Sequence, residues 1–157
     1  PTRRSSDLLG KGGWVDVDEF RKHVGESRDD SDREAWLSHC LEAEKLYRGD
    51  FFQEDLYDPW FSNERELLQQ EYIAVLRRLM DYFEEKADYE KCVRYAWTYL
   101  AADSCDESVY QDLMRYYSFL GNKGMVARTY EKCRESLKNG LDLLPSPETE
   151  ALYRKLI

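Results

Sequence analysis

The feature that most constrains the fold of this chain is an internal repeat with a spacing of 34 residues. The segment LMDYF at 79–83 returns as LMRYY at 113–117, and the similarity continues beyond each segment. Ala87-Asp88 aligns with Gly121-Asn122, so turn-forming residues recur at the same interval as apolar ones. A period of this length is typical of helical units that bury their apolar faces only when neighbouring units stack.

The tetratricopeptide unit, a helix-turn-helix, has this period. The sequence therefore predicts an all-α, tetratricopeptide-like helical solenoid of about seven helices without a convincing strand. Proteins built in this way present extended surfaces to other macromolecules. This architecture favours binding over catalysis.

Capping residues and prolines predict where the helices begin. The predicted starts are Asp16, Ser31, Asp58-Pro59, Asp88, Asp106 and Ser146-Pro147, with a return helix carrying Val126, Tyr130, Cys133 and Leu137. The long helix at 60–86 has a predicted apolar stripe of Leu67, Leu68, Tyr72, Val75, Leu76, Leu79 and Phe83. The helix that follows Asp106 is expected to run through Val109, Tyr110, Leu113, Tyr117 and Leu120 to Gly121.

Length and charge limit the function classes. With 157 residues, 42% of them hydrophobic, the chain can bury a sizeable core. Its net charge of −9 argues against direct binding to a nucleic-acid backbone, which requires clustered Lys and Arg. No apolar run approaches the roughly 18 residues of a membrane span, and no signal peptide is recognisable, so a cytoplasmic location is predicted. The four cysteines lack CxxC spacing and are predicted to be reduced and mostly buried.

The first residues need separate treatment. Residues 1–8, PTRRSSDL, correspond to one reading frame of a common sequencing adapter. We expect residues 1–13 to be a non-native or disordered leader and residues 14–157 to be the folded domain, with any preceding domain cut away. An ordinary disordered basic terminus is the alternative reading of residues 1–8.

No group of residues predicts catalysis, a cofactor or a metal. Adjacent acids such as Glu84-Glu85 and Asp29-Asp30 do not converge on one point, and glycine-rich phosphate loops are missing from the sequence. His23 and His39 lie far apart in the sequence, without a carboxylate-and-cysteine cluster of metal-binding spacing around them. We therefore expect no enzymatic activity, no cofactor and no metal site.

The most informative motif starts with YRGDF at 47–51, continues with DPW at 58–60 and an arginine at 65, and ends with PSPET at 145–149. With WVDVDEF at 14–20, these segments resemble the bacterial transcriptional activator domain, over about residues 14–157. Departures are mild and consist of Phe52 in place of a leucine and Ser104 in place of a frequent proline. The structural motif comprises Tyr47, Gly49, Asp50, Phe51, Pro59, Trp60 and Arg65.

The resemblance implies a function in transcription regulation. In that family, which includes antibiotic regulatory proteins of the SARP type, the domain usually follows a winged helix-turn-helix domain that binds DNA. The resemblance therefore implies a regulatory or oligomerisation domain whose partners are proteins, either itself or the transcription machinery, with DNA contacted only through the absent domain. The alternatives are a stand-alone tetratricopeptide scaffold, and a signalling ATPase regulator with this domain in mid-chain.

A partner-binding groove is expected where the first helix of each repeat lines a concave surface. Its inward-facing residues would be Arg77, Asp81, Gln111 and Arg115, a mixed-charge set suited to a peptide or helix. Plain solvated surface is the alternative for these four. Arg65 is expected to pair with Asp50 or Asp58 and to serve a structural role.

Overall fold

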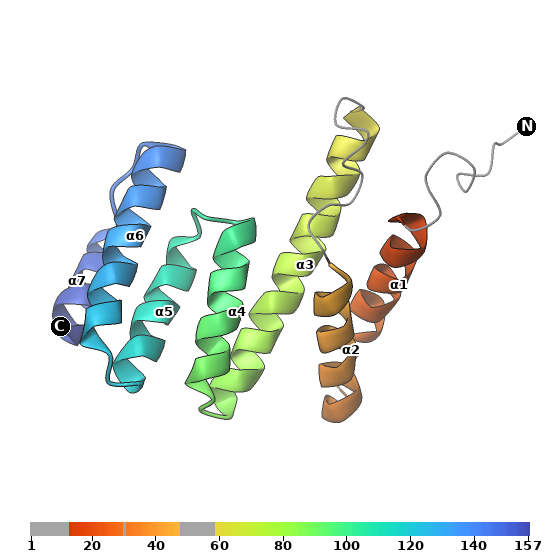
Figure 1. Ribbon diagram of the computed structural model, residues 1–157, viewed down its shortest axis with the longest axis horizontal. Helices are drawn as coiled ribbons and strands as arrows, with labels where there is room; N and C mark the ends of the chain where they lie inside the picture. Colours follow the sequence, from red (N-terminus) through yellow and green to blue (C-terminus); the bar gives the residue numbers. More distant parts are fainter. Residues whose placement is uncertain (1–12, 30, 48–58) are drawn as a thin grey trace, which may run out of the picture. The chain divides into compact units, whose positions relative to one another are not determined.

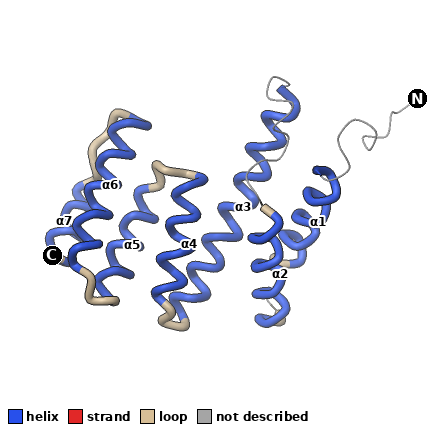
Figure 2. Tube along the Cα trace, in the orientation of Figure 1, coloured by secondary structure: helices blue, strands red, loops and turns tan. Residues whose placement is uncertain are grey.

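The computed structural model describes residues 13–29, 31–47 and 59–157, and within them every regular element is an α-helix (Figure 1). The helices are α1 (Gly13–Glu26), α2 (Arg33–Leu46), α3 (Pro59–Glu85), α4 (Tyr89–Ala102), α5 (Glu107–Phe119), α6 (Lys123–Leu141) and α7 (Pro147–Leu156). Short loops join the helices of the C-terminal part (Figure 2). For the described residues, the prediction of an all-α, tetratricopeptide-like fold of about seven helices is confirmed.

The chain divides into two compact units, residues 1–75 and 76–157, and the division falls within α3. In the first unit, α1 and α2 pack against each other, and Phe20 of α1 and Cys40 of α2 are fully buried. Tyr47, directly after α2, stacks on Tyr72 of α3 with 3.8 Å between the ring centroids. Burial of such aromatic and apolar side chains stabilises the helix pair.

In the second unit, α5 packs against α4, α6 and α7. The C-terminal part of α3 packs on α4, where Phe83 stacks on Tyr95 with 5.6 Å between ring centroids. The buried thiol of Cys92 donates a hydrogen bond to the carbonyl oxygen of Met80 over 3.6 Å. The residues that α4 buries are Cys92, Tyr95, Ala96, Tyr99 and Leu100.

Two helix ends, one repeat apart, share the same backbone geometry. Ala87 after α3 and Gly121 after α5 have positive φ angles of 53° and 71°. The amide of Asp88 donates to the carbonyl five residues back over 2.9 Å, and the amide of Asn122 does so over 2.8 Å. This is the Schellman arrangement, which satisfies carbonyls left over at a helix end. The sequence repeat is therefore also a repeat of backbone conformation.

The predicted caps from Asp88 onward are confirmed, because Asp88, Asp106 and Ser146 each accept a hydrogen bond from an amide in the first turn of the helix that follows. The prediction for Asp16 is wrong, because α1 has already begun at Gly13. The prediction for Ser31 is wrong by one residue. Asp32 caps α2 instead, and its Oδ1 accepts from the second and third amides of the helix over 3.0 and 3.1 Å.

One residue of the predicted apolar stripe, Leu67, is wrong, and Leu120 at the end of α5 is exposed as well. Leu67 is 56% exposed, whereas its neighbour Leu68 is fully buried, because successive residues of a helix point about 100° apart. Leu120 is 43% exposed because it caps α5 beyond the last turn that faces the core. The rest of the predicted stripe on α3 is buried.

Part of the predicted structural motif falls outside the described residues, namely Gly49, Asp50, Phe51 and also Asp58. The backbone of Pro59 and Trp60 forms the first turn of α3, as predicted. Arg65 lies on α3, and its Nη2 donates to Ser62 Oγ over 3.3 Å. Its pairing with Asp50 or Asp58 stays a prediction, as does the leader assigned to residues 1–13.

Candidate functional site

The four predicted groove residues lie on α3 and α5, in the second unit. Arg77 and Gln111 occupy equivalent positions one repeat apart, and so do Asp81 and Arg115. Within each helix the two residues are four positions apart and therefore lie on the same side. Asp81 is exposed and the other three are partly exposed. We call these four residues the α3/α5 face.

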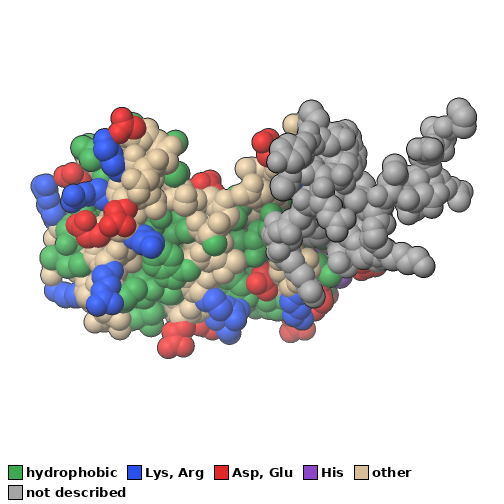
Figure 3. All heavy atoms as spheres, turned by 45° about the horizontal axis from the view of Figure 1, so that its top comes forward, with side chains coloured by type: hydrophobic (Ala, Val, Ile, Leu, Met, Phe, Trp, Pro, Cys, Tyr) green, Lys and Arg blue, Asp and Glu red, His purple; other side chains and the backbone are tan. Residues whose placement is uncertain are grey.

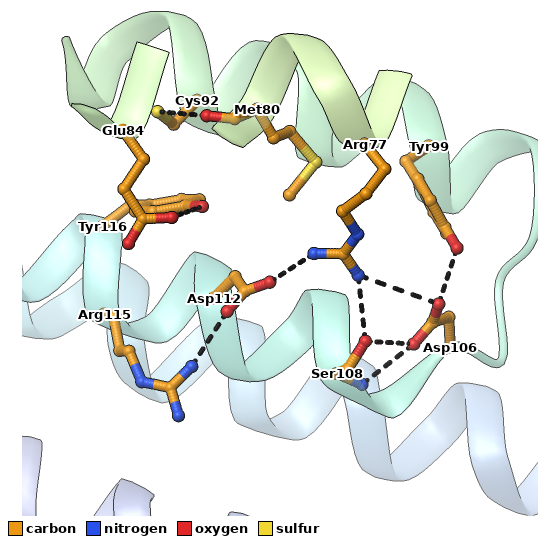
Figure 4. A network of polar contacts seen from close by, with 10 residues as sticks. All are labelled: Arg77, Met80, Glu84, Cys92, Tyr99, Asp106, Ser108, Asp112, Arg115 and Tyr116. Atoms are coloured by element: carbon orange, nitrogen blue, oxygen red, sulfur yellow. Dashed lines mark hydrogen bonds and ion pairs between the residues drawn. The ribbon is translucent and has the colours of Figure 1, made fainter. Parts of the chain in front are cut away.

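Arg77 is the centre of a polar network that links α3 to α5 (Figure 4). Its Nη1 lies 2.6 Å from Asp112 Oδ2, and its Nη2 donates to Ser108 Oγ over 3.0 Å. The guanidinium also lies 5.4 Å from the centroid of the Tyr99 ring on α4. Arg77 therefore joins three helices of the second unit, a structural role that the sequence did not reveal.

Asp106, the cap of α5, belongs to the same network. Its Oδ1 accepts from the amide and hydroxyl of Ser108 over 3.0 and 2.6 Å, and its Oδ2 accepts from Tyr99 over 2.6 Å. Desolvation alone would raise the pKa of Asp106, but these hydrogen bonds and the charge of Arg77 outweigh it and lower the pKa. Desolvation and the nearby Asp106 raise the pKa of Tyr99 to about 12. At neutral pH the pair is a carboxylate and a neutral phenol, a stable hydrogen bond rather than an acid-base couple.

Asp112 lies between two arginines, because Arg115 Nη1 lies 2.8 Å from its Oδ1 (Figure 4). The pKa of Asp81 is raised, first by desolvation and then by the neighbouring carboxylates, although the charge of Arg77 opposes the shift. The α3/α5 face thus carries charges of both signs within one small area.

Gln111, one repeat after Arg77, joins α5 to α7. Its Nε2 donates to the hydroxyl oxygen of Thr149 on α7 over 2.7 Å, and Thr149 is fully buried. Position 77 therefore links α3 to α5, and position 111 links α5 to α7. Only Asp81 and Arg115 of the predicted groove are left without a bond to another helix among the described contacts.

The structure brings together two histidines that the sequence analysis treated as unrelated. Nδ1 of His23 on α1 lies 2.9 Å from Nδ1 of His39 on α2, and Glu26 Oε2 lies 3.0 Å from the latter atom. The separation of the two histidines along the chain does not separate them in space, because α1 packs on α2.

The surface of the C-terminal helices shows no single-sign region on the face drawn in Figure 3, where Lys and Arg side chains lie among Asp and Glu with hydrophobic atoms between them. All four cysteines are thiols, with Cys40, Cys92 and Cys133 buried, as predicted. None of the helices in the described ranges is long and apolar enough to cross a membrane.

The repeated helix pairs and the α3/α5 face place the chain in the class of tetratricopeptide-like helical-repeat proteins. A family model described as the bacterial transcriptional activator domain matches residues 15–157. The chain belongs to this family, which is a family of transcriptional activators, and the predicted resemblance is confirmed. No curated protein and no solved structure shows significant similarity to the chain.

Proposed function

We propose that this chain is the regulatory or oligomerisation domain of a bacterial transcriptional activator and acts through contacts with other proteins in the cytoplasm. The observation that carries the proposal is the family match over residues 15–157. In the intact activator, a winged helix-turn-helix domain N-terminal to this one would bind DNA. The net charge of −9 supports this division, because an acidic domain is repelled by the phosphate backbone.

The contacts on the α3/α5 face separate residues that hold the helices together from residues that are available to a partner. Arg77 and Gln111 are bonded to the next helix of the repeat and hold α3, α5 and α7 in register. Arg115 is bonded only within α5 among the described contacts, and its side chain is 43% exposed. We therefore assign partner binding to Arg115 and Asp81, and assembly of the face to the other two. This arrangement suits a peptide or helix that carries charges of both signs.

Self-association is tested by light scattering on the full chain over a wide concentration range. If this face mediates it, the wild type forms dimers, and Arg115→Glu raises the dimer dissociation constant at least tenfold. Arg128→Glu on the exposed side of α6 is the matched control and leaves the constant unchanged. A strictly monomeric wild type contradicts self-association. Equal effects of the two variants on the dissociation constant contradict the assignment of the dimer contact to the α3/α5 face.

The intact gene separates the transcriptional role from the alternatives. A winged-helix coding stretch before residue 14 supports the activator. A stop codon or an unrelated domain there indicates a stand-alone scaffold, and a Walker motif after residue 157 indicates a signalling ATPase regulator. The affinity for the DNA upstream of the gene is then measured for the intact protein and for the protein without this domain. A difference between the two affinities indicates that this domain regulates the winged helix-turn-helix domain.

A further inference from the structure

The strongest unassigned group of side chains lies where the end of α1 meets α2. His23 and Glu26 belong to the last turn of α1, and His39 lies on α2. The chain contains two histidines, and both are in this group. We propose that His23, Glu26 and His39 bind one divalent ion of the zinc, nickel and copper class. This proposal is independent of the function proposed above.

The geometry fits such an ion. The atoms Nδ1 of His23, Nδ1 of His39 and Oε2 of Glu26 form a triangle with sides of 2.9, 3.0 and 4.0 Å. One point therefore lies about 2.0 Å from all three atoms, and about 2.0–2.2 Å is the usual bond length from zinc to imidazole nitrogen or carboxylate oxygen. A metal ion at this point would lie in the plane of the three atoms and within bonding distance of each of them.

Hydrogen bonding alone satisfies this group poorly. A neutral imidazole carries one ring proton, and a carboxylate only accepts. A proton on His39 Nδ1 can point to Glu26 at 3.0 Å or to His23 at 2.9 Å, and the atom not chosen is left with a lone pair aimed at the group. A metal ion accepts electron density from all three atoms at once, so it resolves a conflict that one proton cannot.

The surroundings favour a cation. The C-terminal end of a helix carries the negative end of its dipole, and α1 ends at Glu26. On the far side of the His23 ring, Nε2 lies 3.9 Å from Glu19 Oε2, and a carboxylate behind a ligating imidazole commonly orients the ring. The side chains of His23, His39 and Glu26 are 19%, 29% and 44% exposed, so an ion can enter from solvent.

The donor set determines the class of ion. Two imidazoles and one carboxylate suit zinc, nickel and copper, whereas magnesium requires an octahedron of oxygen ligands. Three protein ligands leave at least one coordination position for water. Because the ligands come from both helices, the ion would join the end of α1 to α2 and stabilise that pair.

Titration calorimetry with zinc and nickel tests the proposal on the full, untagged chain kept under reducing conditions. We expect saturable binding of one ion per chain, no binding of magnesium, and a melting temperature that rises with zinc concentration. His39→Gln should abolish zinc binding, and Glu26→Gln should weaken it roughly tenfold or more. The control is Glu131→Gln on α6, an exposed acidic residue whose carboxylate lies 3.6 Å from Arg134, and it should bind zinc like the wild type.

Circular dichroism of each variant without metal verifies that the helices are retained. A second readout is the ring-nitrogen NMR spectrum, in which the Nδ1 signals of both histidines should shift on zinc addition. Zinc binding that survives His39→Gln unchanged would place the ion at other residues and overturn the proposal. Absence of saturable binding of both zinc and nickel to the wild type would overturn it equally.

Discussion

Arg77 and Asp112 form an ion pair with 2.6 Å between Nη1 and Oδ2, and this pair fastens α3 to α5 within the second unit. Their side chains are 32% and 21% exposed, so water screens the pair only in part. One repeat later, Gln111 fastens α5 to α7 through Thr149. Equivalent positions of the repeat therefore both join two helices, position 77 through an ion pair and position 111 through a hydrogen bond.

Removal of the central carboxylate should destabilise the protein measurably. Asp112→Ala leaves Arg77 and Arg115 without their shared acceptor, and we expect a loss of about 1–2 kcal/mol in the free energy of unfolding. The control is Glu131→Ala, which removes an exposed pair with Arg134 of 3.6 Å and should cost less than about 0.5 kcal/mol. Urea unfolding compares the two, and equal losses would show that the network adds nothing beyond a surface pair.

Stability should fall in acid because of two carboxylates at the start of α5. Desolvation acts to raise the pKa of Asp106 and of Glu107, but hydrogen bonds outweigh it and lower both values. For Glu107 those bonds come from Thr149 and from the amide and hydroxyl of Ser146.

A carboxyl group whose pKa is lower in the folded state stabilises that state above its unfolded pKa. The ordinary values are 3.8 for Asp and 4.5 for Glu, so the contribution is complete at neutral pH and is lost as pH falls through the lower folded values. Denaturant unfolding between pH 7 and pH 3 measures it. Glu107→Gln should flatten this dependence, and an unchanged slope would contradict the assignment.

The two Schellman turns predict opposite effects of opposite substitutions. Ala87 has the positive φ that Gly121 adopts without strain, so Ala87→Gly should stabilise the protein by about 0.5–1 kcal/mol. Gly121→Ala should destabilise it by about 1 kcal/mol through backbone strain alone, because an added Cβ meets no atom within 4 Å.

Gly124→Ala is the control for Gly121→Ala, because it makes the same substitution at a position with an ordinary φ angle. Gly124 is the second residue of α6 and has no positive φ, so alanine there favours the helix and should stabilise the protein by less than about 1 kcal/mol. Thermal and urea unfolding of the three variants give the comparison. A stabilising Gly121→Ala would refute the left-handed conformation at that turn.

A close contact explains why α6 has glycine at position 140. A Cβ added to Gly140 would lie 2.5 Å from Cys105 Sγ, far inside van der Waals distance. We expect Gly140→Ala to cost about 1–3 kcal/mol through overpacking. In the double variant with Cys105→Ala, most of that cost should disappear. Additive effects in this double-mutant cycle would mean that the two residues do not touch.

The thiols should differ in reactivity. Burial, with a smaller contribution from nearby carboxylates, raises the pKa of Cys92 and of Cys133 to about 12, so neither forms much thiolate at pH 8. Cys105 is partly exposed and should be alkylated first in the folded protein. Mass spectrometry of briefly labelled protein, with and without urea, identifies the modified residue. Rapid labelling of Cys92 or Cys133 in the folded state would contradict their burial.

Features that depend on local sequence were predicted well. The repeat, the caps at Asp88 and Asp106 and the turn at Gly121 need only a few adjacent residues, so their physical causes are visible in the sequence. The prediction at Ser31 missed by one position because Asp32 offers the same chemistry one residue later. Leu67 was misassigned because hydrophobicity alone does not say where an apolar stripe ends.

The sequence by itself determined the all-α repeat and the family, because helix periodicity, capping and the 34-residue spacing are properties of the chain read in order. Only the tertiary structure decided which distant side chains meet. His23 and His39 come within 2.9 Å because α1 packs on α2, and Arg77 reaches Asp112 because α3 and α5 are neighbours. Such pairings depend on helix rotation and packing, which no local pattern encodes.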